Sequence, residues 1–94
     1  MKTVKVSGKN KKHRVVVYSL STCAWCKVLK EFLGENGIEY EYIDIDNTDE
    51  ETREKVIDDI QDRGGRLAYP TTIIDGRILI CGFLEDRLRE ALGI

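Results

Sequence analysis

The sequence predicts an α/β domain in which a four-stranded mixed sheet is covered by three helices. Two observations carry this prediction. A β-branched run at 15–18 is followed by an amphipathic helix and a second strand, and a helix between two strands implies a right-handed parallel crossover. The dipeptide Asp75-Gly76 lies between two apolar runs and is a strong hairpin signal, which adds an antiparallel pair. This arrangement is economical for 94 residues, and we expect residues 1–94 to form a single domain.

The predicted order is β-α-β-α-β-β-α, preceded by a less certain strand at 3–6. The first main strand covers 13–20 and is β-branched at its centre. The helix after it ends near 34–37 and carries apolar residues at helical spacing, namely Cys26, Val28, Leu29, Phe32 and Leu33. We expect Thr22 to cap this helix, which would place Cys23 in its first turn.

The second half of the chain supplies the remaining elements. Alternating residues over 39–46 indicate the next strand. A capping residue at Thr48, with Glu51 three positions later, marks the start of a helix that runs to about Arg63. The last three elements are a strand over 71–74, its hairpin partner over 77–81 and a short final helix over 85–92.

The composition is that of a small soluble protein. The chain is 41% hydrophobic and 34% charged, which argues against a disordered chain. The longest uncharged stretch, 15–26, is too short to cross a bilayer, and the N-terminus has no secretory signal. Three cysteines are too few for a disulfide framework. We therefore expect a cytoplasmic, monomeric protein without a membrane partner.

Charge is distributed unevenly along the chain. Residues 1–30 hold eight basic side chains and no acidic one, whereas all 17 acidic residues follow. A basic segment can bind nucleic acid, but residues 1–14 contain no Phe, Tyr or Trp to stack on a base, and the pI near 5.4 opposes phosphate binding. We expect no nucleic-acid partner, and we interpret the acidic stretch at 39–62 as a solvated face.

Cys23 and Cys26 lie at a strand-to-helix junction, where their spacing brings both thiols to one side of the first turn. Unpaired amides and the helix dipole favour a thiolate at Cys23, whereas Cys26 lies one turn further and is shielded. We therefore predict that Cys23 opens a target disulfide by forming a mixed disulfide, and that Cys26 resolves it.

Other interpretations of these cysteines stand beside this one. A CxxC motif can be half of a zinc site, and Cys81 with His13 would nominally complete four ligands. The helix that continues after Cys26 argues against a zinc knuckle, and we predict neither a metal nor a cofactor. We interpret Cys81 as a small buried hydrophobic residue, or as a regulatory thiol or metal ligand if the hairpin brings it near Cys23. We expect His13 to be exposed and unpartnered at the strand entry.

Pro70 is the only proline, and it precedes the strand at 71–74. The cis form of an X-Pro bond costs only about 0.5–1 kcal/mol, so a fold can hold it. Beside a CxxC motif we expect a cis proline, which would expose the backbone of Tyr69 to an incoming extended peptide. A trans proline that merely opens the strand is the alternative.

Three motifs together resemble the glutaredoxins, over about residues 14–93. They are Cys23-Ala24-Trp25-Cys26 after a buried strand, Tyr69-Pro70-Thr71, and Cys81-Gly82-Phe83 before the final helix. The resemblance implies a thioredoxin fold and dithiol–disulfide exchange, with Cys23 as the attacking thiol. It also implies a substrate site that comprises Thr22, Trp25, Tyr69, Pro70, Thr71, Gly82 and Phe83.

The resemblance further bears on the electron donor. Glutaredoxins that use glutathione commonly carry a lysine three residues before the first cysteine, where this chain has Leu20. Gly82-Phe83 is similar to the redoxins that serve ribonucleotide reductase and draw electrons from thioredoxin reductase. We expect an oxidoreductase that reduces protein disulfides and receives electrons from a thioredoxin-reductase-type donor or from glutathione. An iron–sulfur or metal-binding redoxin that uses Cys23, and a thioredoxin-fold adaptor without turnover, are the alternatives.

Overall fold

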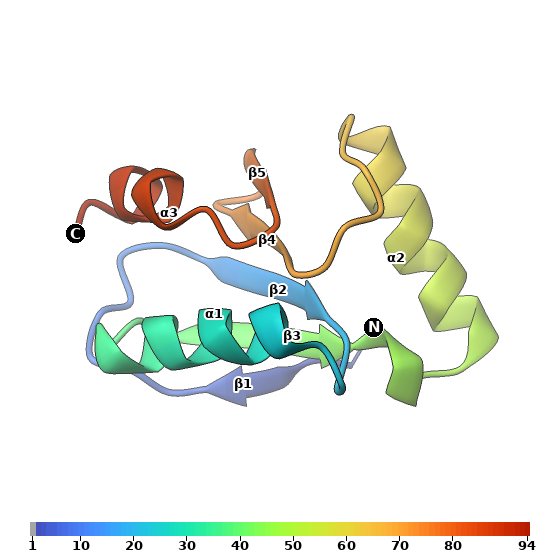
Figure 1. Ribbon diagram of the computed structural model, residues 1–94, viewed down its shortest axis with the longest axis horizontal. Helices are drawn as coiled ribbons and strands as arrows, with labels where there is room; N and C mark the ends of the chain where they lie inside the picture. Colours follow the sequence, from blue (N-terminus) through green and yellow to red (C-terminus); the bar gives the residue numbers. More distant parts are fainter. Residues whose placement is uncertain (1) are drawn as a thin grey trace.

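The computed structural model describes residues 2–94, so Met1, the first residue of the predicted domain, lies outside it. Strands and helices alternate along the described chain as the sequence predicts (Figure 1). The elements are β1 (Val4–Val6), β2 (Val15–Ser19), α1 (Ala24–Glu35), β3 (Tyr40–Asp44), the 3₁₀ helix η1 (Ile45–Asn47), α2 (Glu50–Asp62), β4 (Thr71–Ile74), β5 (Ile78–Cys81) and α3 (Glu85–Leu92).

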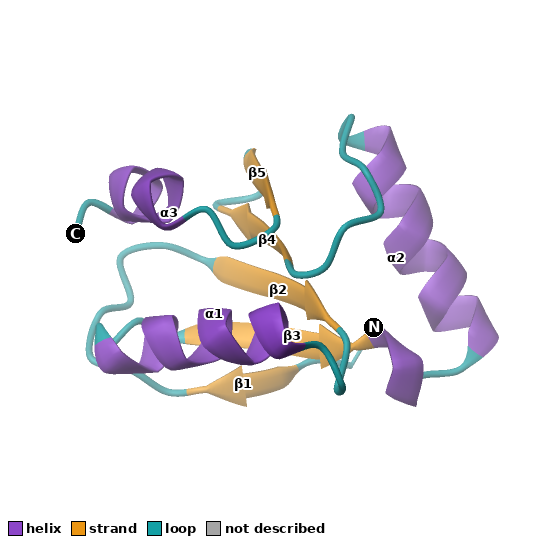
Figure 2. Ribbon diagram, in the orientation of Figure 1, coloured by secondary structure: helices purple, strands orange, loops and turns teal. Residues whose placement is uncertain are grey.

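The strands form one mixed sheet in the order β1-β3-β2-β4-β5. β2 runs parallel to β3 and antiparallel to β4, while β1 and β5 pair antiparallel with β3 and β4 at the two edges. The parallel crossover through α1, the hairpin after β4 and the uncertain N-terminal strand are therefore confirmed. In Figure 2, α1 and α3 lie apart from α2, and the packing assigns them to opposite faces of the sheet.

Alternation along β2 divides the apolar side chains between the two faces. Val15 and Val17 pack against α1 and α3, where Leu29 and Leu88 are fully buried. Tyr18 lies on the other face and packs against α2 together with Val56, Ile60, Ile43 and Ile73. The helical spacing misassigned Val28, whose surface is 37% exposed because it lies on the solvent side of α1.

The cap of α2 differs from the prediction. Asp49 is the N-cap residue, and its Oδ1 accepts the Thr52 N–H at 2.8 Å. The predicted cap, Thr48, instead donates its hydroxyl to the Ile45 carbonyl at 2.8 Å. This bond closes η1, a turn that the alternating pattern over 39–46 concealed. The carboxylate accepts an amide hydrogen bond more strongly than a hydroxyl, so it takes the capping position.

The β4–β5 hairpin is tied to the start of β2. Asp75 and Gly76 both have positive φ, 56° and 68°, as a type I′ turn requires. His13 Nδ1 lies 2.7 Å from Asp75 Oδ2, and the Arg14 N–H donates to Asp75 Oδ1 at 2.9 Å. The expectation that His13 has no partner is therefore wrong: its partner is 62 residues away in sequence.

Asp75 should make the fold sensitive to acid. The bond to His13, and then the Arg14 amide, lower the pKa of Asp75 below the usual value. A carboxyl with a lowered pKa in the folded state contributes stability that is complete above its unfolded pKa of about 3.9 and is lost as pH falls through the folded value. In urea titrations, Asp75→Asn should flatten the loss of stability as pH falls below about 4. Asp58→Asn, at an exposed position of α2, is the control. An unchanged slope in Asp75→Asn would contradict this assignment.

Candidate active site

Cys23 caps the N-terminus of α1 with its own sulfur. Its backbone is extended, with φ −84° and ψ 120°, and Sγ accepts the Cys26 N–H at 3.3 Å. The predicted cap, Thr22, is wrong by one residue, because a sulfur atom can satisfy a free first-turn amide as an oxygen atom does. Cys23 therefore lies at the mouth of the helix, partly exposed, and its thiol points toward the Tyr69 carbonyl, with Sγ and O 3.7 Å apart.

Cys26 is the inner thiol, as its position in the helix predicts. It is fully buried between α1 and the sheet, and both cysteines are free thiols. Burial above all, together with the hydrogen bond and the charge of Cys23, raises the pKa of Cys26 to about 12. The Leu20 N–H and the Lys30 ammonium act in the opposite direction. The two thiols thus differ in access, and the inner thiol is held in its protonated form.

The loop before β4 forms one wall beside Cys23. The Tyr69–Pro70 peptide bond is cis, which confirms that expectation, and Pro70 is buried. Burial raises the pKa of Tyr69, and the charge of Cys26 adds to the effect, because the phenol lies close to the inner thiol. Thr71 is also buried, and its hydroxyl donates to the Ala68 carbonyl at 2.6 Å. Through this hydrogen bond Thr71 stabilises the loop that carries Tyr69 and Pro70.

The opposite wall is aromatic. Phe83 stacks on Trp25, with ring centroids 6.0 Å apart, and meets Phe32 edge-on at 5.7 Å. Trp25 keeps 61% of its surface exposed. Gly82 joins the two walls, because its N–H donates to the Pro70 carbonyl at 2.6 Å, and its φ of 89° suits glycine. Thr22, another predicted site residue, directly precedes Cys23 in the sequence, and its side chain is exposed.

Cys81 lies apart from the CxxC motif. It pairs with Thr71 across β4–β5 and shares its face of the sheet with Leu79, which packs toward α2. It is half-buried and lines a cavity of about 430 Å³. His13 is at the far end of β2 from Cys23. Within residues 2–94, no group of three or more His, Cys, Asp or Glu side chains could hold a metal ion, so the four-ligand zinc alternative is not supported.

Sequence reasoning missed a polar cluster next to the site. Ser19 ends β2 and Ser21 follows it, Asp44 ends β3 and Asp46 follows it, and the side chains bond in pairs. Lys30 of α1 joins the inner pair through Asp44 Oδ1 at 3.0 Å. The signal was present as Ser-x-Ser and Asp-x-Asp at the ends of two predicted parallel strands.

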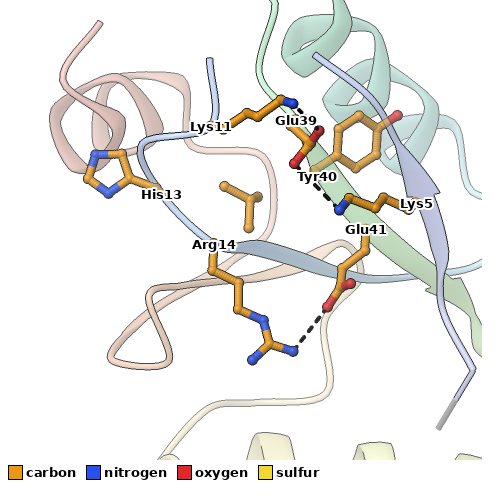
Figure 3. Close-up of a pocket in the computed structure, with 8 residues that line it drawn as sticks. Lys5, Lys11, His13, Arg14, Glu39, Tyr40 and Glu41 are labelled. Carbon is orange, nitrogen blue, oxygen red and sulfur yellow. Dashed lines mark hydrogen bonds and ion pairs between the residues drawn. The ribbon is translucent and has the colours of Figure 1, made fainter. Parts of the chain in front are cut away.

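A cavity of about 310 Å³ at the opposite end of β2 has a different character (Figure 3). Its charged side chains are engaged in ion pairs: Lys5 and Lys11 both approach Glu39, and Arg14 pairs with Glu41 at 3.2 Å. No cysteine lines it, and the two thiols of the CxxC motif lie at the other end of β2. No helix in the described part of the chain has the length and apolar content to span a membrane.

Comparisons with known proteins agree with this geometry. A glutaredoxin family model matches residues 15–79. Glutaredoxin 1 of Rickettsia conorii is 35% identical over 79 residues, which cover 83% of this chain and 74% of that protein. The solved glutaredoxin of Methanosarcina mazei Go1 has a TM-score of 0.89 and 33% identity, covering all of this chain and 90% of that one. Methanoredoxin of Methanosarcina acetivorans has a TM-score of 0.87 and 36% identity, covering 100% and 97%. These similarities confirm the thioredoxin-like fold.

Proposed function

The chain belongs to the glutaredoxin family of thiol–disulfide oxidoreductases, and from this premise we propose that it reduces disulfides of protein substrates by dithiol exchange. Cys23 is the nucleophile and Cys26 the resolving thiol. The observation that carries the proposal is the asymmetry of the two thiols. Cys23 is partly exposed at the N-terminus of α1, whereas Cys26 is fully buried behind it and has a raised pKa.

In the first step the Cys23 thiolate attacks one sulfur of the target disulfide. The target S–S bond breaks, a mixed disulfide forms on Cys23, and the second target sulfur leaves as a thiolate. The Cys26 N–H, 3.3 Å from Cys23 Sγ, supports this step because a hydrogen bond to a charged sulfur is stronger than one to a neutral sulfur. The raised pKa of Cys26 keeps the inner thiol protonated meanwhile.

In the second step Cys26 attacks the Cys23 sulfur and releases the reduced target. Burial, the largest cause of the raised pKa of Cys26, persists at this stage, but the pKa falls because other causes are removed. Two of them, the hydrogen bond and the charge of Cys23, vanish once Cys23 is part of a disulfide. The Leu20 N–H and the Lys30 ammonium then favour the Cys26 thiolate. The target has gained two electrons, and the protein holds a Cys23–Cys26 disulfide, which a donor must reduce with two electrons and two protons.

The target binds as an extended segment along the loop that carries the cis proline. The Tyr69 carbonyl, now the acceptor of the Cys23 thiol, is the group that an incoming backbone N–H would reach. Thr22, Trp25 and Phe83 border the sulfur opposite the loop that carries Pro70. Gly82 joins the two sides through the Pro70 carbonyl, and Thr71 supports the loop beneath Pro70. The exposed indole offers apolar area next to the reacting sulfur.

The donor is a thioredoxin-reductase-type enzyme or glutathione. Leu20, in place of a lysine, and the Gly82-Phe83 pair favour the reductase. Supplying each donor to the oxidised protein, with a small disulfide as final acceptor, separates the two. A rate that follows only the reductase assigns it as the donor.

The test of the function is a redox titration followed by intact mass. Protein equilibrated without oxygen in dithiothreitol buffers should lose two hydrogens reversibly, mapped to Cys23 and Cys26. Its midpoint should lie between about −200 and −270 mV, the span of glutaredoxins and thioredoxins. A loss mapped to Cys81, or a midpoint that changes with added iron or zinc, would contradict the proposal.

A further inference from the structure

Two serine–aspartate pairs continue the parallel β2–β3 pairing up to the CxxC motif. Ser19 lies opposite Asp44 in the strand register. Two residues further on each segment, Ser21 bonds to Asp46. The pairs therefore form two successive rungs, and the outer rung ends two residues before Cys23.

The inner rung is a buried anchor. The Ser19 side chain is fully buried, and its hydroxyl donates to Asp44 Oδ1. Lys30 Nζ donates to the same oxygen at 3.0 Å and lies 3.9 Å from the centroid of the Tyr42 ring. The charge of Asp44 is thereby compensated, and the end of β2 is fixed to both β3 and α1.

The outer rung holds the loop that carries Cys23. The Ser21 N–H donates to Asp46 Oδ1 at 2.9 Å, and the Ser21 hydroxyl donates to Oδ2, so both carboxylate oxygens are engaged by one residue. The Cys23 N–H then donates to the Leu20 carbonyl at 3.2 Å, which closes a tight turn around Ser21. The position of Ser21 therefore sets the position of Cys23.

The backbone on either side of Asp46 is bonded to Arg53 of α2. It lies in η1, whose carbonyls accept from the Arg53 guanidinium: Nε donates to Ile45 at 3.4 Å, and Nη2 donates to Thr48 just beyond η1 at 3.3 Å. The hydroxyl and amide of Ser21 lower the pKa of Asp46, so the carboxylate stays charged well below neutral pH. The support runs from α2 through η1 and Asp46 to the nucleophile.

We propose that Asp46 is a positioning residue for thiol exchange: it fixes Ser21 and so aims Cys23 at the target disulfide. The inference rests on the proposed function. Asp46 is exposed, so its bonds add little to global stability. Their effect falls on the reaction, because a displacement of a reacting group by about 1 Å can slow a reaction about 100-fold.

The test compares Asp46→Ala with Asp49→Ala. Asp49 is a matched control, because it is also an exposed carboxylate bonded to a backbone amide, but it caps α2 and does not touch the loop. Both variants are made in Cys26→Ser protein, so that the adduct on Cys23 is not resolved and the Cys26 position keeps its N–H to Cys23 Sγ. Reduced protein is mixed with an uncharged aromatic disulfide, and the rate constant for adduct formation on Cys23 is measured together with the urea midpoint. Asp46→Ala should react at least about tenfold more slowly with little change in midpoint. Asp49→Ala should lower the midpoint and keep the rate within about twofold.

Two further variants test the mechanism. Ser21→Ala combined with Asp46→Ala should be no slower than Asp46→Ala alone, because the two residues act as one unit. Asp46→Asn keeps an oxygen acceptor for the Ser21 amide and should recover part of the rate. An unchanged rate in Asp46→Ala, or equal slowing in Asp49→Ala, overturns the inference alone. If Cys26→Ser protein forms no adduct, or forms one that persists when Cys23 is also replaced by serine, the proposed function is overturned, and this inference with it.

Discussion

Replacement of Cys26 by serine should stop turnover at the mixed disulfide while leaving the first attack intact. Serine keeps the backbone N–H that donates to Cys23 Sγ, so the nucleophile retains its position. The hydroxyl cannot attack a disulfide, and the target stays bound to Cys23. With no other thiol present, steady-state reduction of a protein disulfide should fall by at least about 10³-fold, as expected when a reacting group is lost. Intact mass should show one target molecule per chain.

Two controls define this experiment. Cys81→Ser should turn over like the wild type, because Cys81 lies on the α2 face of the sheet, away from Cys26. Cys23→Ser should form no adduct at all. Wild-type turnover by Cys26→Ser would show that Cys26 does not resolve the intermediate. An adduct on Cys81 would show that Cys81, and not Cys23, attacks the target disulfide.

Leu29→Ala should remove much of the stability of the fold. Leu29 is fully buried on the inner side of α1, one turn after Cys26, where it packs with Val17 and Leu33. Truncation leaves a cavity, and such substitutions cost about 2–5 kcal/mol. The free energy of unfolding in urea should fall by about 3 kcal/mol. The redox midpoint should also move, because α1 presses Cys26 against the sheet.

Val28→Ala is the control on the same helix. Its side chain is 37% exposed on the outer side of α1, so its loss should change the free energy of unfolding by less than about 1 kcal/mol. Equal effects of the two substitutions would show that α1 is rotated relative to the packing described. A larger loss of unfolding free energy in Val28→Ala than in Leu29→Ala would show that Val28, and not Leu29, lies on the buried side of α1.

The elements with strong periodicity were predictable from sequence, as was the CxxC motif. β2 has no charged residue, and the Asp75-Gly76 hairpin is local, so both depend on neighbours in the chain. The caps were less predictable, because the choice between Thr22 and Cys23, or between Thr48 and Asp49, depends on which atom reaches the free amides. Propensity ranks the residue types, whereas only geometry decides between adjacent candidates.

The polar contacts between residues far apart in the chain could not be predicted from a single sequence. His13 and Asp75 meet across 62 positions, and Ser21 and Asp46 meet across 25. Each pair depends on the register between strands, which is fixed by the packing of a whole face of the sheet. The outer serine–aspartate pair could be anticipated only after β2 and β3 are known to be parallel and in the observed register.

The site described above draws on almost the whole length of the chain, which has a consequence for biosynthesis. The ribosome delivers residues in order, N-terminus first. Cys23 and Cys26 leave it long before Tyr69 and Pro70, and Phe83, which stacks on Trp25, follows later still. A nascent chain therefore carries both thiols before either of the segments that flank Cys23 in the folded protein is complete. The surroundings that Cys23 and Cys26 have in the folded protein are therefore complete only when synthesis is nearly finished.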